Sequence, residues 1–249
     1  MGLIVKTQSG KTLTEIENDL AEKISDAILS GRTLPEFPEG LSLAEAYELQ
    51  HQVTALRPEG ALGIKAGVTA RNAQAFFGLD HALLASLYGG RRLASGAQIS
   101  YVEGRLVETE VAIKMDENGC PISIAPALEI VAVRFSDSKQ MNAANLVGCN
   151  LGADLIVVGE FQPWQPAFDQ LAISLRRSEA VINDSVVSDA LGGPEKGAPW
   201  LLSEASQRGF KLDDDVIFMM GACGKAIPAE RGVYQGNYGA LGNIELVVK

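Results

Sequence analysis

The sequence has few of the residues on which common catalytic sites depend. It holds only two histidines, His51 and His81, and neither stands in an H-E-x-x-H motif or beside a recognisable nucleophile. This argues against a Ser-His-Asp or Cys-His site and against a zinc site built from histidines. The three cysteines form no C-x-x-C pair. Their odd number also argues against a disulfide framework.

Basic clusters and long apolar runs are also missing. The net charge is −10, and the only basic doublets are Arg91-Arg92 and Arg176-Arg177, so we expect no nucleic-acid partner. No segment approaches the roughly 18 uninterrupted apolar residues of a membrane span. The short apolar run of the first ten residues does not fit a signal peptide. The composition therefore predicts a cytoplasmic protein with no membrane partner.

What is present begins with a helical pattern. Residues 12–30 and 42–56 are predicted helices, and a Pro-Glu-Phe-Pro-Glu-Gly loop lies between them. Ser42 with Glu45 three residues later forms a capping box at the start of the second helix. In the first helix, apolar residues recur at helical spacing: Ile16, Leu20, Ile24 and Ile28. We therefore predict a helical N-terminal segment over residues 1–60.

Beyond residue 60, short apolar runs alternate with glycine and proline, a pattern typical of strands. The predicted strands cover residues 62–68, 106–115, 129–135, 171–175, 216–220 and 242–248, and the predicted helices 70–77, 142–149 and 198–208. Strands and helices do not alternate regularly, so a doubly wound parallel sheet is disfavoured. The pattern predicts an α+β, β-rich domain over residues 61–249.

One predicted strand carries two glutamates. Glu108 and Glu110 are two residues apart, so their side chains project from the same strand face. Two neighbouring carboxylates repel each other unless a positive charge lies between them. The alternative is a pair that faces solvent on an edge strand, which is common for glutamate.

Two isolated charges in apolar runs favour a buried acidic site. Glu129 lies in Pro-Ala-Leu-Glu-Ile-Val-Ala-Val, and buried glutamates are rarely left without a partner. Three carboxylates form an all-oxygen site, which suits Mg²⁺ or Mn²⁺. Lys65 lies between Gly63 and Gly67, and it either faces the acidic cluster or extends to the surface.

Five motifs in this order resemble the fumarylacetoacetate hydrolase-like superfamily, and within it the branch of 2-keto-4-pentenoate hydratases and 4-oxalocrotonate decarboxylases. The resemblance covers residues 43–249. Its motifs are Gly63-Ile-Lys-Ala-Gly-Val-Thr, Gly78-Leu-Asp, Val107-Glu-Thr-Glu-Val-Ala, Pro126-Ala-Leu-Glu-Ile-Val-Ala-Val-Arg, and the tail from Gly221 through Tyr238-Gly-Ala-Leu-Gly.

The resemblance implies a fold, a cofactor and a set of site residues. The fold is a mixed β-sheet roll of the fumarylacetoacetate hydrolase C-terminal type with a small helical N-terminal part. Glu108, Glu110 and Glu129 would ligate Mg²⁺ or Mn²⁺, and Lys65 and Asp80 would be catalytic. The implied substrate contacts are Gly67, Thr69, Leu128, Arg134 and Gly221. The family also generally assembles, so we expect a homo-oligomer.

The activity implied is a metal-dependent lyase of aromatic catabolism, a hydratase of 2-hydroxypenta-2,4-dienoate-type acids. A 4-oxalocrotonate decarboxylase is the first alternative, because both reactions stabilise the same enolate and the triad does not distinguish them. An acylpyruvate-type C–C hydrolase is another, with His81 as the histidine near a matching motif. The last is a non-catalytic partner of such an enzyme. Departures from the family pattern lie in residues 132–142, where the sequence retains Arg134.

Overall fold

The computed structural model describes residues 13–212 and 215–249, and the side chains of these residues except 13–18. The N-terminal ten residues, Thr12 and the side chain of Ile16, all used in the sequence predictions, lie outside the described residues. Among the described residues, no helix combines the length and the apolar character that a membrane crossing requires.

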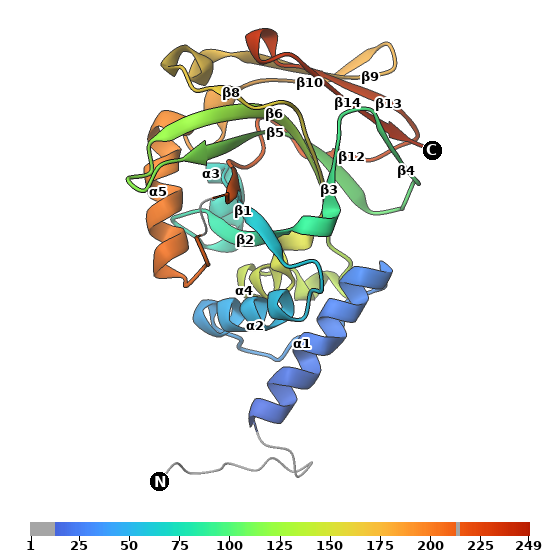
Figure 1. Cartoon of the computed structure of the whole chain (residues 1–249). Coiled ribbons are helices and arrows are strands. Elements are labelled where there is room, and N and C mark those ends of the chain that lie inside the picture. Colours follow the sequence, from blue (N-terminus) through green and yellow to red (C-terminus); the bar gives the residue numbers. More distant parts are fainter. Residues whose placement is uncertain (1–12, 213–214) are drawn as a thin grey trace.

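Two helices form the N-terminal part, as predicted. Helix α1 (Leu13–Ser30) and helix α2 (Leu43–Ala55) pack against each other beneath the sheets, with α4 (Ala143–Gly148) beside α2 (Figure 1). The predicted capping box is confirmed: Glu45 N donates to Ser42 Oγ at 3.3 Å, and Ser42 N donates to Glu45 Oε2 at 2.9 Å. This box satisfies two backbone donors that a helix start leaves free.

The larger sheet has nine strands and curls into a roll. Its main path runs in the order β2 (Leu83–Tyr88), β1 (Ala61–Gly67), β11 (Ile217–Met219), β5 (Arg105–Met115), β6 (Pro121–Ala132), β7 (Ala153–Val158) and β3 (Arg92–Leu93). Two short strands join it, β12 (Ile227–Pro228) along β5 and β8 (Gln162–Pro163) along β6. Strands β2 and β7 also contact each other, so the curl brings distant parts of the sheet together.

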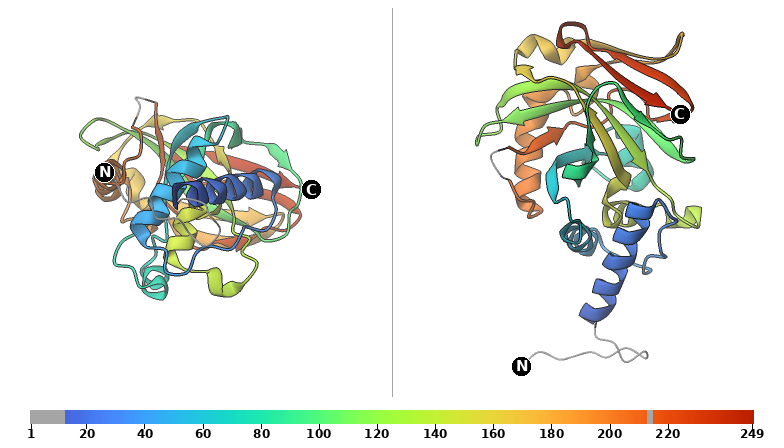
Figure 2. Two further views of the ribbon diagram at one scale, coloured as in Figure 1. Left: turned by 90° about the horizontal axis from the view of Figure 1, so that it is seen from below. Right: turned by 45° about the vertical axis from the view of Figure 1, so that its right-hand side comes forward.

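A second sheet covers the outer face of β5 and β6, as the right view in Figure 2 shows. It contains β10 (Ala180–Val186), β9 (Ala172–Arg177), β13 (Gly232–Asn237), β14 (Asn243–Val248) and β4 (Ala97–Ile99) in this order. Helix α5 (Pro194–Gln207) lies along the side of the roll (Figure 1). The remaining helix, α3 (Arg71–Phe77), follows β1.

Along β5 and β6, odd-numbered and even-numbered residues face opposite sides of the larger sheet. The outer face of β5 and β6 contributes Val107, Val111, Leu128 and Ile130 to the core shared with the second sheet. The inner face contributes small residues, Ala112, Ala125 and Ala127, to a smaller cluster inside the roll. This division follows from the two-residue period of strands. The predicted α+β, β-rich roll is confirmed.

One predicted strand has wrong boundaries. We expected a strand over residues 129–135, but β6 runs from Pro121 to Ala132 and includes Pro126. A proline is tolerated where no neighbouring strand needs its missing N–H group. Pairing of β6 with β7 starts only at Ala127, so Pro126 lies beyond the end of that ladder.

The helical segment shares its packing with the sheets. Ala46 and Tyr47 of α2 belong to the main core, and the backbone N–H of Leu84 in β2 donates to the Tyr47 hydroxyl at 3.0 Å. The division of the chain into residues 1–60 and 61–249 stays a prediction.

The capping box gives a test of local stability. Replacing Ser42 with Ala should lower the free energy of unfolding by about 1 kcal/mol, because a helix N–H loses its acceptor. Urea unfolding followed by circular dichroism measures the change. Ser206→Ala, at an exposed position near the end of α5, is the control and should shift stability by only a few tenths of a kcal/mol. Equal stabilities of the two variants would contradict this role of Ser42.

Candidate metal centre

Strands β5 and β6 bring the three predicted glutamates together on the inner face of the roll. Their antiparallel register places Glu108 directly opposite Glu129, and Glu110 follows two residues along β5. One carboxylate oxygen from each residue lies within 4.8 Å of the others. Glu110 and Glu129 are buried, at 0% and 1% exposure. The solvent-facing alternative is therefore wrong.

A lysine supplies the positive charge that such a cluster requires. Lys65 in β1 is 2% exposed, and its Nζ lies 2.7 Å from Glu129 Oε1. It also donates to the backbone carbonyl of Leu151 at 3.1 Å. Burial disfavours the ammonium form, but the carboxylates of Glu129 and Glu108 outweigh this effect and raise the pKa of Lys65. The lysine therefore faces the acidic cluster and stays charged.

Glu108 and Glu110 have no such close ion pair among the described residues, and their ionised forms are destabilised. Burial, followed by repulsion from Glu129, raises the pKa of Glu108 to about 7. The same two causes, with Glu108 adding to the repulsion, raise the pKa of Glu110 well above its usual value. A single lysine thus does not compensate three carboxylates, and a divalent cation would remove the remaining repulsion.

The hydrogen bonds around the triad leave oxygens free for a cation. Gly221 N donates to Glu110 Oε2 at 2.9 Å, which fixes that carboxylate. In the part of the chain that the structure describes, Glu110 Oε1 and Glu129 Oε2 have no hydrogen-bond partner although both are buried. Buried carboxylate oxygens without donors are costly. The residues therefore fit an oxygen-ligated divalent ion such as Mg²⁺ or Mn²⁺.

The carbonyl that accepts from Lys65 belongs to an unusual turn. Asn150 and Leu151 are consecutive residues with left-handed backbone angles, φ +57° and +49°. The Asn150 side chain holds this turn by bonding both backbone groups of Ser86 in β2, each at 2.8 Å. A leucine in this region costs energy and persists only where its surroundings enforce it. Here the turn directs a carbonyl at Lys65.

Three of the predicted substrate contacts lie close to the triad. Gly67 ends β1, two residues after Lys65, and lies against the side chain of Leu151. Gly221 has φ +96°, and a Cβ there would lie 2.5 Å from Thr69 Cγ2. Only glycine therefore allows the Gly221 amide to reach Glu110 beside Thr69.

The other two predicted contacts lie elsewhere. Leu128 points into the core on the opposite face of β6 from Glu129, so it would offer a ligand only its backbone. Arg134 follows the end of β6 and is half-buried near Asp154, and burial lowers its pKa. No described contact joins Arg134 to the triad.

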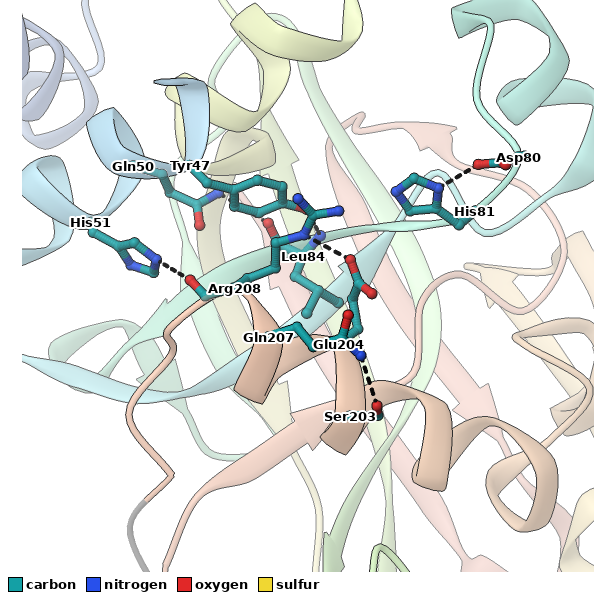
Figure 3. A network of polar contacts seen from close by, with 10 residues as sticks. All are labelled: Tyr47, Gln50, His51, Asp80, His81, Leu84, Ser203, Glu204, Gln207 and Arg208. Carbon is teal, nitrogen blue, oxygen red and sulfur yellow. Dashed lines mark hydrogen bonds and ion pairs between the residues drawn. The ribbon is translucent and has the colours of Figure 1, made fainter. Parts of the chain in front are cut away.

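Asp80 is exposed in the loop that leads into β2 (Figure 3). Its side chain is 95% exposed and lies 2.5 Å from His81 Nδ1. The hydrogen bond from His81 lowers the pKa of Asp80. The loop lies at the Gly67 end of β1, because Leu83 pairs with Gly67. The described contacts do not join Asp80 to the triad, and its catalytic role stays a prediction.

The sequence predictions missed several residues that build the centre. Asn150 and Leu151 had no signal beyond their place in the chain, and Gly221 was expected as a substrate contact but not as a donor to Glu110. A further buried asparagine, Asn183 of β10, is bonded to Thr109 between the two β5 glutamates. Such contacts depend on long-range register, which local periodicity does not report.

The fold and the site together define an α+β roll of the fumarylacetoacetate hydrolase type with a candidate divalent-metal centre. No protein-family model matches the chain. Among curated proteins, it is 22% identical over 250 residues to the 2-keto-4-pentenoate hydratase of Paraburkholderia xenovorans LB400, covering 91% of this chain and 92% of the relative. "2-Keto-4-pentenoate hydratase 3" of Pseudomonas putida matches equally.

Solved structures share the fold. One is the 4-oxalocrotonate decarboxylase from Pseudomonas putida G7, complexed with magnesium and adipate, which is 19% identical to this chain and has a TM-score of 0.84. The match covers 96% of this chain and 99% of the decarboxylase chain. The fumarylpyruvate hydrolase from Pseudomonas aeruginosa, in complex with Mn²⁺ and pyruvate, has a TM-score of 0.56 at 16% identity, over 74% and 88% of the two chains. The predicted resemblance to the hydratase and decarboxylase branch is confirmed.

The raised pKa of Glu108 gives a pH-dependent prediction. In the metal-free fold Glu108 retains its proton up to about pH 7, whereas an unfolded glutamate releases it near pH 4.3 (about the model-peptide value). The folded state then binds more protons between these values, so metal-free stability should fall as pH rises through this window. A bound cation replaces the proton. The rise in Tm on adding Mg²⁺ should therefore be larger at pH 8 than at pH 5.5.

Thermal unfolding with and without Mg²⁺ at both pH values measures this difference. In Glu108→Gln the Mg²⁺-induced rise in Tm should be small at both pH values. An equal Mg²⁺-induced rise at the two pH values in the unmodified protein would contradict the assignment of Glu108 as a ligand.

Proposed function

We propose that the chain is a divalent-metal-dependent hydratase of 2-hydroxypenta-2,4-dienoate-type acids in aromatic catabolism. The observation that carries the proposal is the carboxylate triad of Glu108, Glu110 and Glu129, which has Lys65 on one side. Two buried oxygens of this triad have no hydrogen-bond partner among the described residues. The curated relatives that match this chain are named 2-keto-4-pentenoate hydratases, and the match covers nearly their whole length. Mg²⁺ or Mn²⁺ is the proposed cofactor.

The triad would hold the cation with charges nearly balanced. Three ionised carboxylates and the Lys65 ammonium leave two negative charges, which a divalent ion neutralises. When bound, such an ion supplies a Lewis acid that stabilises negative charge developing on a substrate oxygen. Glu110 is already oriented by Gly221 N and Glu129 by Lys65. Little reorganisation would therefore be needed on binding.

Lys65 would bind or protonate the substrate and would not act as a base. Its raised pKa keeps the ammonium charged at neutral pH. Two fixed acceptors, Glu129 Oε1 and the Leu151 carbonyl, orient it. A positioned ammonium stabilises a substrate carboxylate or donates a proton to a developing carbanion.

Asp80 would act as a base in this scheme. Its pKa is lowered by the hydrogen bond from His81, so the carboxylate is ionised at neutral pH and cannot serve as the acid before it has taken up a proton. Its loop lies at the same end of β1 as Gly67. Proton transfer to and from the substrate carbons would then be divided between Asp80 and Lys65.

Decarboxylation of 2-oxo-3-hexenedioate is the second candidate. It is favoured by the close likeness in fold to the 4-oxalocrotonate decarboxylase. Both reactions need the same electron sink, and they differ in whether water adds or CO₂ leaves. An acylpyruvate hydrolase, in which the Asp80–His81 pair would activate water, and a non-catalytic partner chain are the remaining alternatives.

An assay with two substrates separates these candidates. With Mg²⁺ and 2-hydroxypenta-2,4-dienoate we expect loss of the conjugated chromophore without release of CO₂, and EDTA should abolish it. With 2-oxo-3-hexenedioate we expect no CO₂. Release of CO₂ from the second substrate alone would make the chain a decarboxylase. No turnover of either substrate at saturating Mg²⁺ would reject the lyase proposal.

The triad is tested by substitutions that preserve size. Glu129→Gln should lower kcat/KM at least a hundredfold, because it removes a ligand and the partner of Lys65. Lys65→Met should lower kcat without abolishing metal binding. Glu117→Gln, in the exposed turn between β5 and β6, is the control and should match the unmodified enzyme. Activity retained in Glu129→Gln would reject the metal site as the catalytic centre.

We also propose that the protein is cytoplasmic and, as the family resemblance implies, a homo-oligomer. The three cysteines are free, and Cys149 and Cys223 are buried, which suits a reducing compartment. Light scattering of the purified protein measures the assembly. The proposed partners are a small 2-oxo or 2-hydroxydienoic acid and further copies of the chain.

A further inference from the structure

Behind the metal centre, a buried polar network joins the two sheets. Asn183 of β10 and Thr109 of β5 are 5% and 0% exposed. The Asn183 amide donates to Thr109 Oγ1 and to the Cys223 carbonyl, each at 2.9 Å. The Thr109 hydroxyl donates to the same carbonyl at 2.7 Å. The network is far more polar than the apolar core around it.

The segment that this network holds is a bulge in the strand beside β5. Met220 N donates to the Val111 carbonyl and Cys223 N to the Thr109 carbonyl. From Met220 to Cys223 the chain advances three residues, whereas β5 advances only two between Thr109 and Val111. The segment opposite β5 therefore contains one extra residue. Bulges of this kind redirect a backbone group or side chain, often beside active sites.

The extra residue places an amide on the metal-facing side of β5. Gly221 lies inside the bulge and donates to Glu110 Oε2 at 2.9 Å. Without that donor, Glu110 would keep both oxygens unbound, since its other oxygen has no described partner. The bulge therefore fixes which oxygen of Glu110 is left for a cation.

Asn183 fits this bulge closely. A Cβ on Gly224, which has φ +85°, would lie 2.6 Å from Asn183 Oδ1. That same oxygen accepts from Lys225 N at 3.2 Å. The amide thus binds both sides of Gly224, through the carbonyl of Cys223 and the N–H of Lys225. An aspartate or an apolar residue could not make both bonds.

We infer that Asn183 and Thr109 are positioning residues for the metal ligand Glu110: they hold the 220–225 bulge from behind, so that the Gly221 amide orients the Glu110 carboxylate. The inference rests on the proposed metal site. It assigns to the second sheet a part in metal affinity, although that sheet supplies no ligand of the triad. Groups that orient metal ligands typically change affinity by about 10- to 100-fold when removed.

The test is the affinity for Mn²⁺ of purified full-length variants, measured by calorimetry and by electron paramagnetic resonance. Thr109→Val removes only the hydroxyl from a side chain of similar shape, and Asn183→Ala removes the amide. We expect each to raise the Mn²⁺ dissociation constant about tenfold and to alter the zero-field splitting of bound Mn²⁺. Thr109→Ser retains the hydroxyl and should bind within about threefold of the unmodified protein.

Asn145→Ala is the matched control. Asn145 is also buried, and its amide donates to a backbone carbonyl, that of Gln140, at 2.9 Å. This substitution should lower stability while leaving Mn²⁺ affinity unchanged. All variants are compared at temperatures at which circular dichroism shows them folded.

The outcomes separate this inference from the proposed function. Mn²⁺ binding by the unmodified protein, with unchanged affinity in Thr109→Val and Asn183→Ala, would overturn the inference and leave the metal site standing. Equal weakening in Asn145→Ala would also overturn it, because general destabilisation would then explain the loss. Absence of Mn²⁺ binding in the unmodified protein would overturn both the metal site and the positioning role.

Discussion

The structure depends on holding three carboxylates, two of them fully buried and one half-buried, opposite one ammonium inside a β roll. Lys65 and Glu129 form an ion pair at 2.7 Å, and both side chains are buried. A buried ion pair gains little net stability over apolar packing, because both ions lose their hydration. Glu108 and Glu110 add two further acidic groups to this site. A fold can retain such an arrangement where a cation compensates the excess negative charge, so the charge balance supports the proposed metal site.

The surrounding elements restrict this cluster from several sides. The β5–β6 register sets Glu108 opposite Glu129, and β1 brings Lys65 to the same side. The left-handed turn at Leu151 directs a carbonyl at Lys65, and the bulge at Gly221 directs an amide at Glu110. Each contact supplies the backbone group that complements one charged side chain. Under the proposed function this would be preorganisation, in which hydrogen bonds fix the carboxylates before a cation and a substrate bind.

Much of the site could be predicted from the sequence, because its main features are local. Two-residue spacing placed Glu108 and Glu110 on one face, and isolated charges in apolar runs marked Glu129 and Lys65. The start of α2 followed from its capping box. The predicted start of this strand at residue 129 was wrong, since β6 begins at Pro121 and includes Pro126. Asn150, Asn183 and the Gly221 amide could not be predicted, since each acts across many residues of intervening chain.

Two residues expected near the substrate lie apart from the triad. Asp80 and Arg134 were expected near the substrate from sequence motifs, but Asp80 faces solvent beside His81 and Arg134 lies near Asp154. The two proposed reactions, hydration and decarboxylation, would differ in the groups that face the substrate, whereas both would use the metal held by the triad. Both proposed reactions therefore depend on the metal site. A crystal soaked in Mn²⁺ tests it directly through an anomalous difference map. We expect one strong peak about 2.0–2.3 Å from oxygens of Glu108, Glu110 and Glu129. A map without that peak, or with Mn²⁺ bound only elsewhere, would show that the triad is not a metal site.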